Sequence, residues 1–166
     1  MPLLTGVLSL APQLTFVGDT DVGPAPYKAL TDALATLTID GADLAPDVLV
    51  ADVRSLASGA NETLDFTAIG EALAGKSVTL AKIYGLIVIG ADANATALTC
   101  GAAASNAWTG PLGGTDPTFT LDAGAGSFQA FFTTAGWDVD SSHKSFKVAN
   151  ASGATASYTL IIIGET

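Results

Sequence analysis

The chain has 166 residues, of which 49% are hydrophobic and only 13% are charged, and its formal net charge is −10. This length suits one domain with a sizeable core, and the apolar composition excludes an intrinsically disordered chain. The excess of acids argues against a nucleic-acid partner, because phosphate binding needs a basic surface. The sequence contains no run of about 18 apolar residues, so no membrane-spanning helix is predicted.

Residues 1–26 are predicted to form an extended N-terminal arm, followed by one domain over residues 27–166. Four prolines and three glycines interrupt this first segment, and two short strand-like stretches lie between them, Leu4–Leu10 and Leu14–Val17. Such a segment can pair with a neighbouring subunit, or it can be the first strand of the domain; we favour the arm. Its candidate partner contacts are the apolar residues Leu3, Leu4 and Phe16.

The window Tyr27–Ile39 fits two structures. Leu30, Leu34 and Leu37 have the i, i+4, i+7 spacing of a helical stripe, whereas the alternation towards Ile39 also allows a strand. The alanine and leucine content favours one short helix here.

The most strand-like stretch is Val78–Gly90, VTLAKIYGLIVIG. It begins with alternating residues and ends in the apolar run Leu86–Ile89, which predicts a central strand buried on both faces in its second half. Ile87, in the middle of that run, is therefore expected in the core. The stretch Tyr158–Gly164, YTLIIIG, has the same character and is expected to be its companion.

From residue 47 on, about eight strand-like stretches recur roughly 8–12 residues apart, separated by Gly, Asn and Asp turns. This spacing is typical of an antiparallel sandwich or a closed antiparallel sheet, and we predict an all-β, jelly-roll-like sandwich with at most one short helix. Gly70–Lys76 is expected to be a loop or a helical turn. The remaining expected strands are Asp47–Leu56, Glu62–Ile69, Ala95–Cys100, Thr118–Leu121, Phe128–Phe132 and Lys144–Val148, and Gly136–Asp140 is expected to be a bend that leads into the last of these.

No catalytic, cofactor-binding or metal-binding residue is predicted. The single cysteine, Cys100, cannot form an intrachain disulfide and is expected to be a small buried residue, because the only histidine is His143, in a polar turn. Asp19–Asp21 and Asp138–Asp140 each space two carboxylates, but neither continues as a calcium loop, and we interpret them as solvated turn acids. The chain is therefore not expected to be an enzyme.

Trp108 and Trp137 are two further candidate partner contacts. A pair of exposed tryptophans would suit stacking on a sugar ring, and a sugar-binding module is the alternative function. The favoured interpretation is that Trp137, next to Gly136, packs on the core or in a subunit contact, because no cluster of Asn, Asp and aromatic residues recurs around both tryptophans.

The chain from Asp52 to Thr166 resembles small virion structural proteins of tailed bacteriophages, of the kind that decorate or cement the head. The similarity rests on short motifs, among them two paired strands, a Ser-Asn-Ala loop and a C-terminal apolar strand. The matching segments are Asp52–Leu56, Asn61–Phe66, Lys82–Ile83, Ser105–Gly110, Ala135–Val139, Lys147–Asn150 and Tyr158–Gly164.

This resemblance implies a non-enzymatic protein on the capsid surface of a virion. It implies that the chain forms a homotrimer with itself and bridges neighbouring copies of the major capsid protein. A neck or tail position in the virion stays open as an alternative. Low surface charge and apolar interfaces suit such a role, and the net negative charge would keep the particle exterior soluble.

Overall fold

The computed structural model describes residues 6–9, 36–39, 46, 48–71 and 76–166, and this part of the chain contains strands and no helix. The strands are β1 (Gly6–Ser9), β2 (Thr36–Ile39), β3 (Val48–Leu56), β4 (Asn61–Asp65), β5 (Ile69–Glu71), β6 (Lys76–Val78), β7 (Lys82–Gly90), β8 (Leu98–Ala102), β9 (Thr118–Leu121), β10 (Phe128–Asp138), β11 (Ser145–Asn150) and β12 (Ala156–Glu165).

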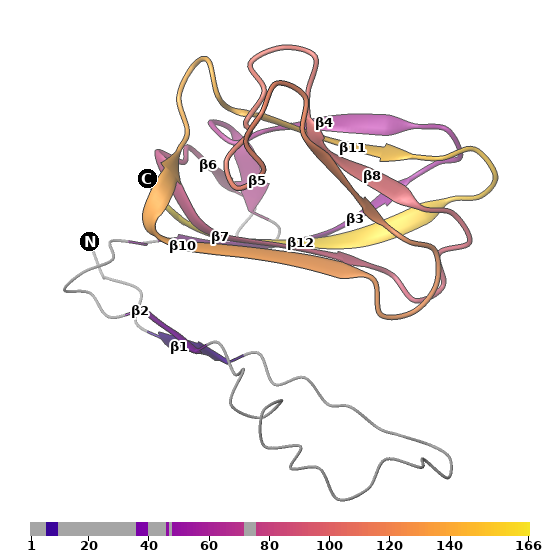
Figure 1. The fold of residues 1–166 in the computed structure, drawn as a ribbon, viewed down its shortest axis with the longest axis horizontal. Coiled ribbons are helices and arrows are strands. Elements are labelled where there is room, and N and C mark those ends of the chain that lie inside the picture. Colours follow the sequence, from indigo (N-terminus) through magenta and orange to yellow (C-terminus); the bar gives the residue numbers. More distant parts are fainter. Residues whose placement is uncertain (1–5, 10–35, 40–45, 47, 72–75) are drawn as a thin grey trace, which may run out of the picture.

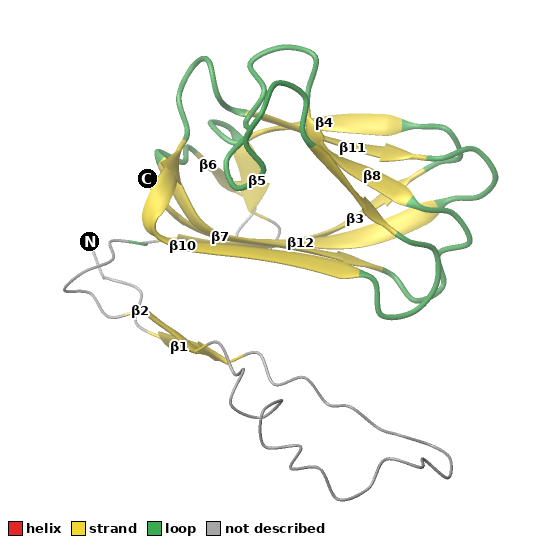
Figure 2. Ribbon diagram, viewed as in Figure 1, coloured by secondary structure: helices red, strands yellow, loops and turns green. Residues whose placement is uncertain are grey.

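Eight of these strands form two antiparallel sheets that face each other as a sandwich (Figures 1 and 2). Sheet I has the order β10-β7-β12-β3 and sheet II has the order β4-β11-β8-β9. Along the chain, successive sandwich strands alternate between the sheets at every step except β8 to β9. The prediction of an all-β antiparallel sandwich is confirmed.

The two most apolar stretches of the sequence lie side by side in the centre of sheet I. Strand β12 pairs with β7 along one edge, and the paired residues run from Tyr158 and Gly90 at one end to Glu165 and Lys82 at the other. Along its other edge β12 pairs with β3. Runs rich in β-branched residues favour this position, because their side chains fit a pleated surface that is covered by a second layer. The predicted companionship of these two stretches is confirmed.

The stretch Val78–Gly90 is not one strand, in contrast to the prediction. Val78 ends β6, which pairs with β5, and β7 begins only at Lys82. Between them the Leu80 amide donates to the carbonyl of Phe66 at 3.0 Å, and its side chain is buried. The interruption lets Leu80 enter the core. The ends of the expected loop Gly70–Lys76 belong to β5 and β6.

The prediction that β7 is buried on both faces in its second half is also wrong. Leu86 and Val88 are fully buried, whereas Ile87 is half-buried and Ile89 is 38% exposed. The sandwich has two layers, so each strand of sheet I turns alternate residues away from the other sheet. An unbroken apolar run therefore marks a strand whose outer face is apolar as well, and Ile87 lies on that outer face.

Strand β10 is longer than expected. The sequence predicts a strand over Phe128–Phe132 and a bend at Gly136, but the structure has one strand to Asp138 that shifts its register on β7 between Phe132 and Trp137. Gly136 lies within this shift with φ +74°, a conformation that favours glycine. The bend is thus an irregularity within the strand.

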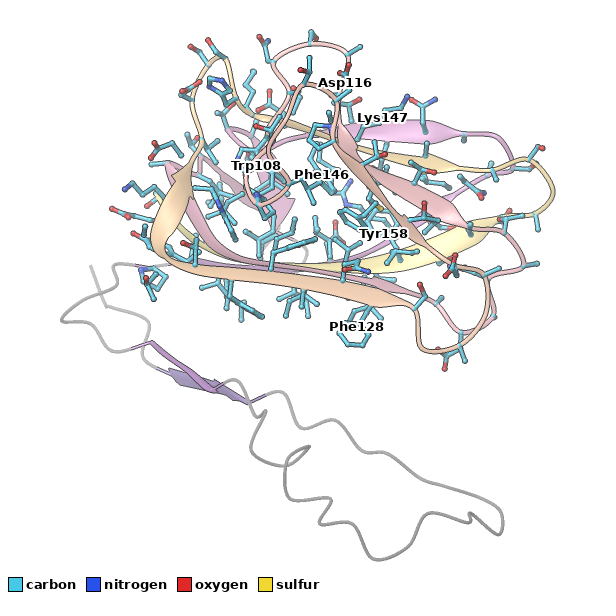
Figure 3. The ribbon with its side chains drawn as sticks, viewed as in Figure 1. Trp108, Asp116, Phe128, Phe146, Lys147 and Tyr158 are labelled. Atoms are coloured by element: carbon cyan, nitrogen blue, oxygen red, sulfur yellow. The ribbon has the colours of Figure 1, made fainter. Side chains whose placement is uncertain are left out.

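Aromatic side chains fill one end of the core. The rings of Phe66 and Trp108 meet edge to face at 5.1 Å, and Phe66 stacks on Phe146 at 5.9 Å. Figure 3 shows Trp108, Phe146 and Tyr158 directed between the sheets, while Phe128 projects from the opposite side of sheet I. Phe119 of β9 and Phe131 of β10 add a contact between the two sheets, with ring centroids 5.5 Å apart.

Two buried asparagines tie the turns to the sheets. Asn150 Nδ2 donates to the carbonyls of Leu56 and Ala154, and its Oδ1 accepts a hydrogen bond from Thr96. Asn94 forms two hydrogen bonds of 2.8 Å with the backbone of Ser157: its Nδ2 donates to the carbonyl, and its Oδ1 accepts from the amide. Buried amides need such partners, and here they fix the loops at the ends of the sandwich.

Strands β1 and β2 form a separate antiparallel hairpin, with Gly6 opposite Ile39 and Ser9 opposite Thr36. Thr36–Ile39 is therefore a strand, so the favoured helix is wrong for these residues, where pairing with β1 overrides local propensity. The part of the expected helix over residues 27–35 lies outside the described residues. The division into an arm (1–26) and a domain (27–166) stays a prediction. Leu3, Leu4 and Phe16 also lie outside the described residues.

Candidate functional sites

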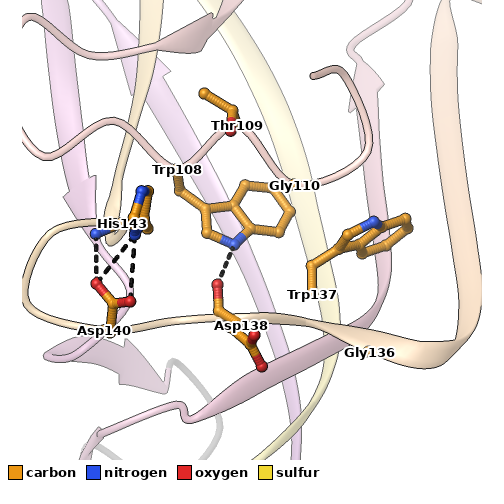
Figure 4. A pocket seen from close by; sticks show the side chains of 8 residues that line it. All are labelled: Trp108, Thr109, Gly110, Gly136, Trp137, Asp138, Asp140 and His143. Atoms are coloured by element: carbon orange, nitrogen blue, oxygen red, sulfur yellow. Dashed lines mark hydrogen bonds and ion pairs between the residues drawn. The ribbon is translucent and has the colours of Figure 1, made fainter. Parts of the chain in front are cut away.

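A depression of about 390 Å³ opens beside the end of β10 (Figure 4). It brings the two tryptophans of the sequence together with a histidine and two aspartates. Its lining residues are Trp108, Thr109, Gly110, Gly136, Trp137, Asp138, Asp140 and His143. We call it the indole pocket.

Trp108 forms the inner wall of the indole pocket. Only 2% of it is exposed, its Nε1 donates to the carbonyl of Asp138 at 3.2 Å, and its ring meets that of Trp137 edge to face at 6.1 Å. Gly110 lies against this indole, because a Cβ there would fall 2.4 Å from the Trp108 ring. Trp108 is therefore a core residue. Trp137 packs against the core, in agreement with the favoured interpretation, but it is only half-buried and is the tryptophan whose ring is open to a ligand.

The polar rim of the indole pocket is a self-contained turn. Asp140 Oδ1 accepts hydrogen bonds from the backbone amides of Ser142 and His143, at 2.6 and 2.8 Å, and His143 Nδ1 lies 3.2 Å from both carboxylate oxygens. The hydrogen bond with His143, followed by those with the amides, lowers the pKa of Asp140. The carboxylate is thus an ionised acceptor that can bind hydroxyl groups, and His143 is exposed as expected.

The described residues offer little for other chemistry. Cys100 is fully buried in β8, and burial raises the pKa of its thiol to about 12, so it stays protonated at neutral pH. Among the described residues, no three His, Cys, Asp or Glu side chains come together as metal ligands. Asp138 is exposed and lies 3.8 Å from Lys82, while Val139 between the two aspartates is buried.

A second feature is the outer surface of sheet I, which we call the apolar face. The strand registers align its outward residues in three rows across β10, β7, β12 and β3. Thr159 is the only polar residue among the twelve positions. The rows are Phe128–Ile89–Thr159–Val53, Ala130–Ile87–Ile161–Ala51 and Phe132–Gly85–Ile163–Leu49.

Large side chains on this face are open to solvent. Val53 is 73% exposed, Phe128 49% and Leu49 42%. In the third row Phe132 and Ile163 close over Gly85, where an added Cβ would approach them to 3.0 and 3.3 Å. No Asp, Glu, Lys or Arg interrupts the three rows. The largest apolar patch of a protein is often a functional surface, so this face is a candidate interaction site.

The outer surface of sheet II has the opposite character, and we call it the polar face. Its rows are Thr118–Gly101–Lys147–Thr63 and Thr120–Thr99–Ala149–Asn61. Threonines, an asparagine and a lysine therefore stand where sheet I has isoleucine, valine and phenylalanine. The two outer faces of the sandwich thus differ in polarity.

The two tryptophans stand out in the sequence, and the structure brings them together in the indole pocket. The apolar face does not stand out in the sequence, because its residues come from four strands that are distant from one another along the chain. A signal was present in β3, where Leu49 and Val53 break a simple alternation of buried apolar and exposed polar residues.

Comparisons with protein-family models, with curated protein sequences and with solved structures found no match for this chain. Within the described part of the chain, no helix is long and apolar enough to span a membrane.

Proposed function

We propose that this protein is a non-enzymatic structural protein of a tailed-phage virion, acting as a homotrimeric capsid decoration protein on the head surface that bridges major capsid proteins. The apolar face of sheet I is the observation that carries the proposal. A protein whose work is to hold others together needs an uncharged surface on a rigid frame, and this face supplies one. The sequence resemblance supplies the virion context.

The strand order supports a jelly roll as the finer description of the sandwich. The chain passes back and forth between the two sheets, so that neighbouring strands within a sheet are mostly distant in sequence. Double Greek-key sandwiches of this type recur in viral capsid proteins. Such wrapping makes the sandwich rigid, which suits a protein that resists deformation of a shell.

The polar groups support a binding role over catalysis. In the indole pocket His143, the only histidine, lies beside Asp140 in a turn. The hydrogen bonds of these two side chains involve backbone amides and each other, and no serine hydroxyl or cysteine thiol takes part in them. The buried thiol of Cys100 is protonated at neutral pH. An activated nucleophile needs a base within hydrogen-bond reach, and this arrangement does not provide one.

The copy number of the protein in purified virions tests the proposal. Quantitative mass spectrometry against the major capsid protein should give hundreds of copies per particle, and light scattering of the purified protein should give a trimer. A few copies per particle would place the protein in the neck or tail instead. Absence from purified virions, or a monomer in solution, would contradict the proposal.

The indole pocket favours a second candidate function, a sugar-binding module. The half-buried Trp137 ring and the carboxylates of Asp138 and Asp140 border one depression, which is the combination that stacks on and hydrogen-bonds a sugar. Trp137→Ala should then abolish binding on a glycan array while the fold is kept, and Phe128→Ala, on the apolar face, should leave binding unchanged. An array on which the unaltered protein binds no glycan would reject this candidate.

A further inference from the structure

The apolar face has a size that limits what can cover it. Four strands about 4.8 Å apart and three rows about 6.8 Å apart span roughly 400 Å². A standard protein interface buries about 800 Å² on each partner, so two such faces packed together would make only about half of one. The occupant is therefore a small element that forms one part of a larger contact.

The β1–β2 hairpin is an element of that size, and it belongs to neither sheet of the sandwich. It pairs four residues with four, as a two-stranded sheet of its own. Isolated two-stranded hairpins are marginally stable in water and need an apolar surface to pack on. In sequence, Thr36, Leu37, Thr38 and Ile39 alternate, and Leu8 is the register partner of Leu37, a pattern typical of a strand pair with one apolar side. The pattern of the hairpin thus calls for an apolar surface to pack on, and the apolar face is such a surface.

The chain connects the hairpin to the rim of the apolar face. Nine residue steps separate Ile39 from Val48, and they span at most about 30 Å. Val48 opens β3, the edge strand of sheet I, and Leu49 already belongs to the third row of the face. A hairpin on this tether reaches the apolar face of its own sandwich or that of an adjacent copy.

In the part of the chain that the structure describes, large side chains of the apolar face stay exposed. Val53, Phe128, Leu49 and Ile89 keep their exposure with the hairpin present, and Figure 1 shows the hairpin outside the sandwich, on the side of sheet I. We propose that the β1–β2 hairpin of a second copy of this chain packs on the apolar face. The contact is head to tail, so three copies can close a ring in which every face is covered. This inference rests on the proposed homotrimer and names the surface that forms it.

Cysteine cross-linking between differently tagged, co-expressed chains tests the inference. One chain carries Val53→Cys in the first row of the apolar face, and the other carries Leu37→Cys in the hairpin. Oxidation should yield a two-tag dimer on a non-reducing gel. Thr99→Cys, on the exposed polar face, replaces Val53→Cys as the matched control and should not cross-link to Leu37→Cys. The native Cys100 is buried and should not form a cross-link in any of the samples.

Three outcomes would overturn the inference. Cross-linking of the Val53→Cys chain to itself would show two faces packed together. A chain that carries both Val53→Cys and Leu37→Cys could instead form a disulfide within itself and give no two-tag dimer, which would show that the hairpin packs on its own sandwich. Equal cross-linking at Val53 and Thr99 would show no specific contact.

Light scattering separates failure of this inference from failure of the proposed function. Val53→Asp should convert the trimer to monomers, and Thr99→Asp should leave it intact. A Val53→Asp protein that stays trimeric would overturn the inference while the proposed function stands. An unaltered protein that is monomeric would overturn both.

Discussion

The Nε1 of Trp108 donates a hydrogen bond of 3.2 Å to the backbone carbonyl of Asp138, which joins the loop after β8 to the last residue of β10. The same indole contacts the rings of Phe66, Trp137 and Phe146. One buried side chain therefore holds the two sheets, the loop and the wall of the indole pocket together. This makes Trp108 a structural residue, although it lines the pocket.

Trp108→Ala should lower the free energy of unfolding by about 3–5 kcal/mol, because it leaves a large cavity and an unpaired carbonyl. Trp137→Ala should cost less, because Trp137 is only half-buried. Urea unfolding followed by circular dichroism measures both values. Equal losses for the two variants would contradict the assignment of Trp108 to the core.

Asn150→Ala should destabilise the sandwich by about 2–3 kcal/mol. The variant leaves the buried carbonyls of Leu56 and Ala154 and the hydroxyl of Thr96 without their partner. Asn61→Ala, at an exposed position of β4, is the matched control and should change stability by less than about 0.5 kcal/mol. Thermal unfolding of both variants gives the comparison, and similar melting temperatures would show that the amide network contributes little.

Leu86→Asp and Ile87→Asp should behave differently although they are neighbours in β7. Leu86 is fully buried between the sheets, so a carboxylate there has no partner and the protein should not fold. Ile87 is half-buried on the apolar face, so its variant should fold and lose self-association instead. Soluble yield, circular dichroism and light scattering distinguish these results, and an unfolded Ile87→Asp would place this residue in the core after all.

Much of the fold could be predicted from local patterns. The segment Thr118–Leu121 is a strand with the expected bounds, and the pairing of β7 with β12 follows from their shared β-branched character. The strands themselves depend on residues close in sequence, where the period of two and the turn residues act directly, whereas the pairing joins residues far apart such as Ile161 and Ile87. The all-β class therefore needed no tertiary information.

Other features depend on neighbours that the sequence does not identify. The break at Leu80 arises because its amide pairs with Phe66, which lies fourteen positions earlier. The apolar run in β7 looks the same whether its second face meets another layer of this chain, solvent or another copy. Only the register across four strands shows that Ile87, Ile161 and Ala130 form one outward row. Of the candidate sites, the tryptophans are visible in the sequence and the apolar face is not.

Stability should fall below about pH 4 partly through the ion pair of Asp65 and Lys144. Lys144 Nζ lies 2.6 Å from Asp65 Oδ2, and hydrogen bonds from Lys144 and then Thr67 lower the pKa of Asp65 in the folded protein. A carboxyl whose folded pKa lies below its unfolded value, about 3.9, stabilises the fold above that value. This contribution is lost as the pH drops through the lower folded pKa.

Asp65→Asn tests this contribution. The variant should be less stable than the unaltered protein at pH 7, by up to about 1 kcal/mol because the pair is partly exposed, and the difference should shrink towards pH 2. Asp116→Asn, at an exposed position before β9, is the control and should follow the unaltered protein throughout. Melting temperatures between pH 2 and pH 7 check this, and a constant gap for Asp65→Asn across that range would show that the pair does not act through its charge.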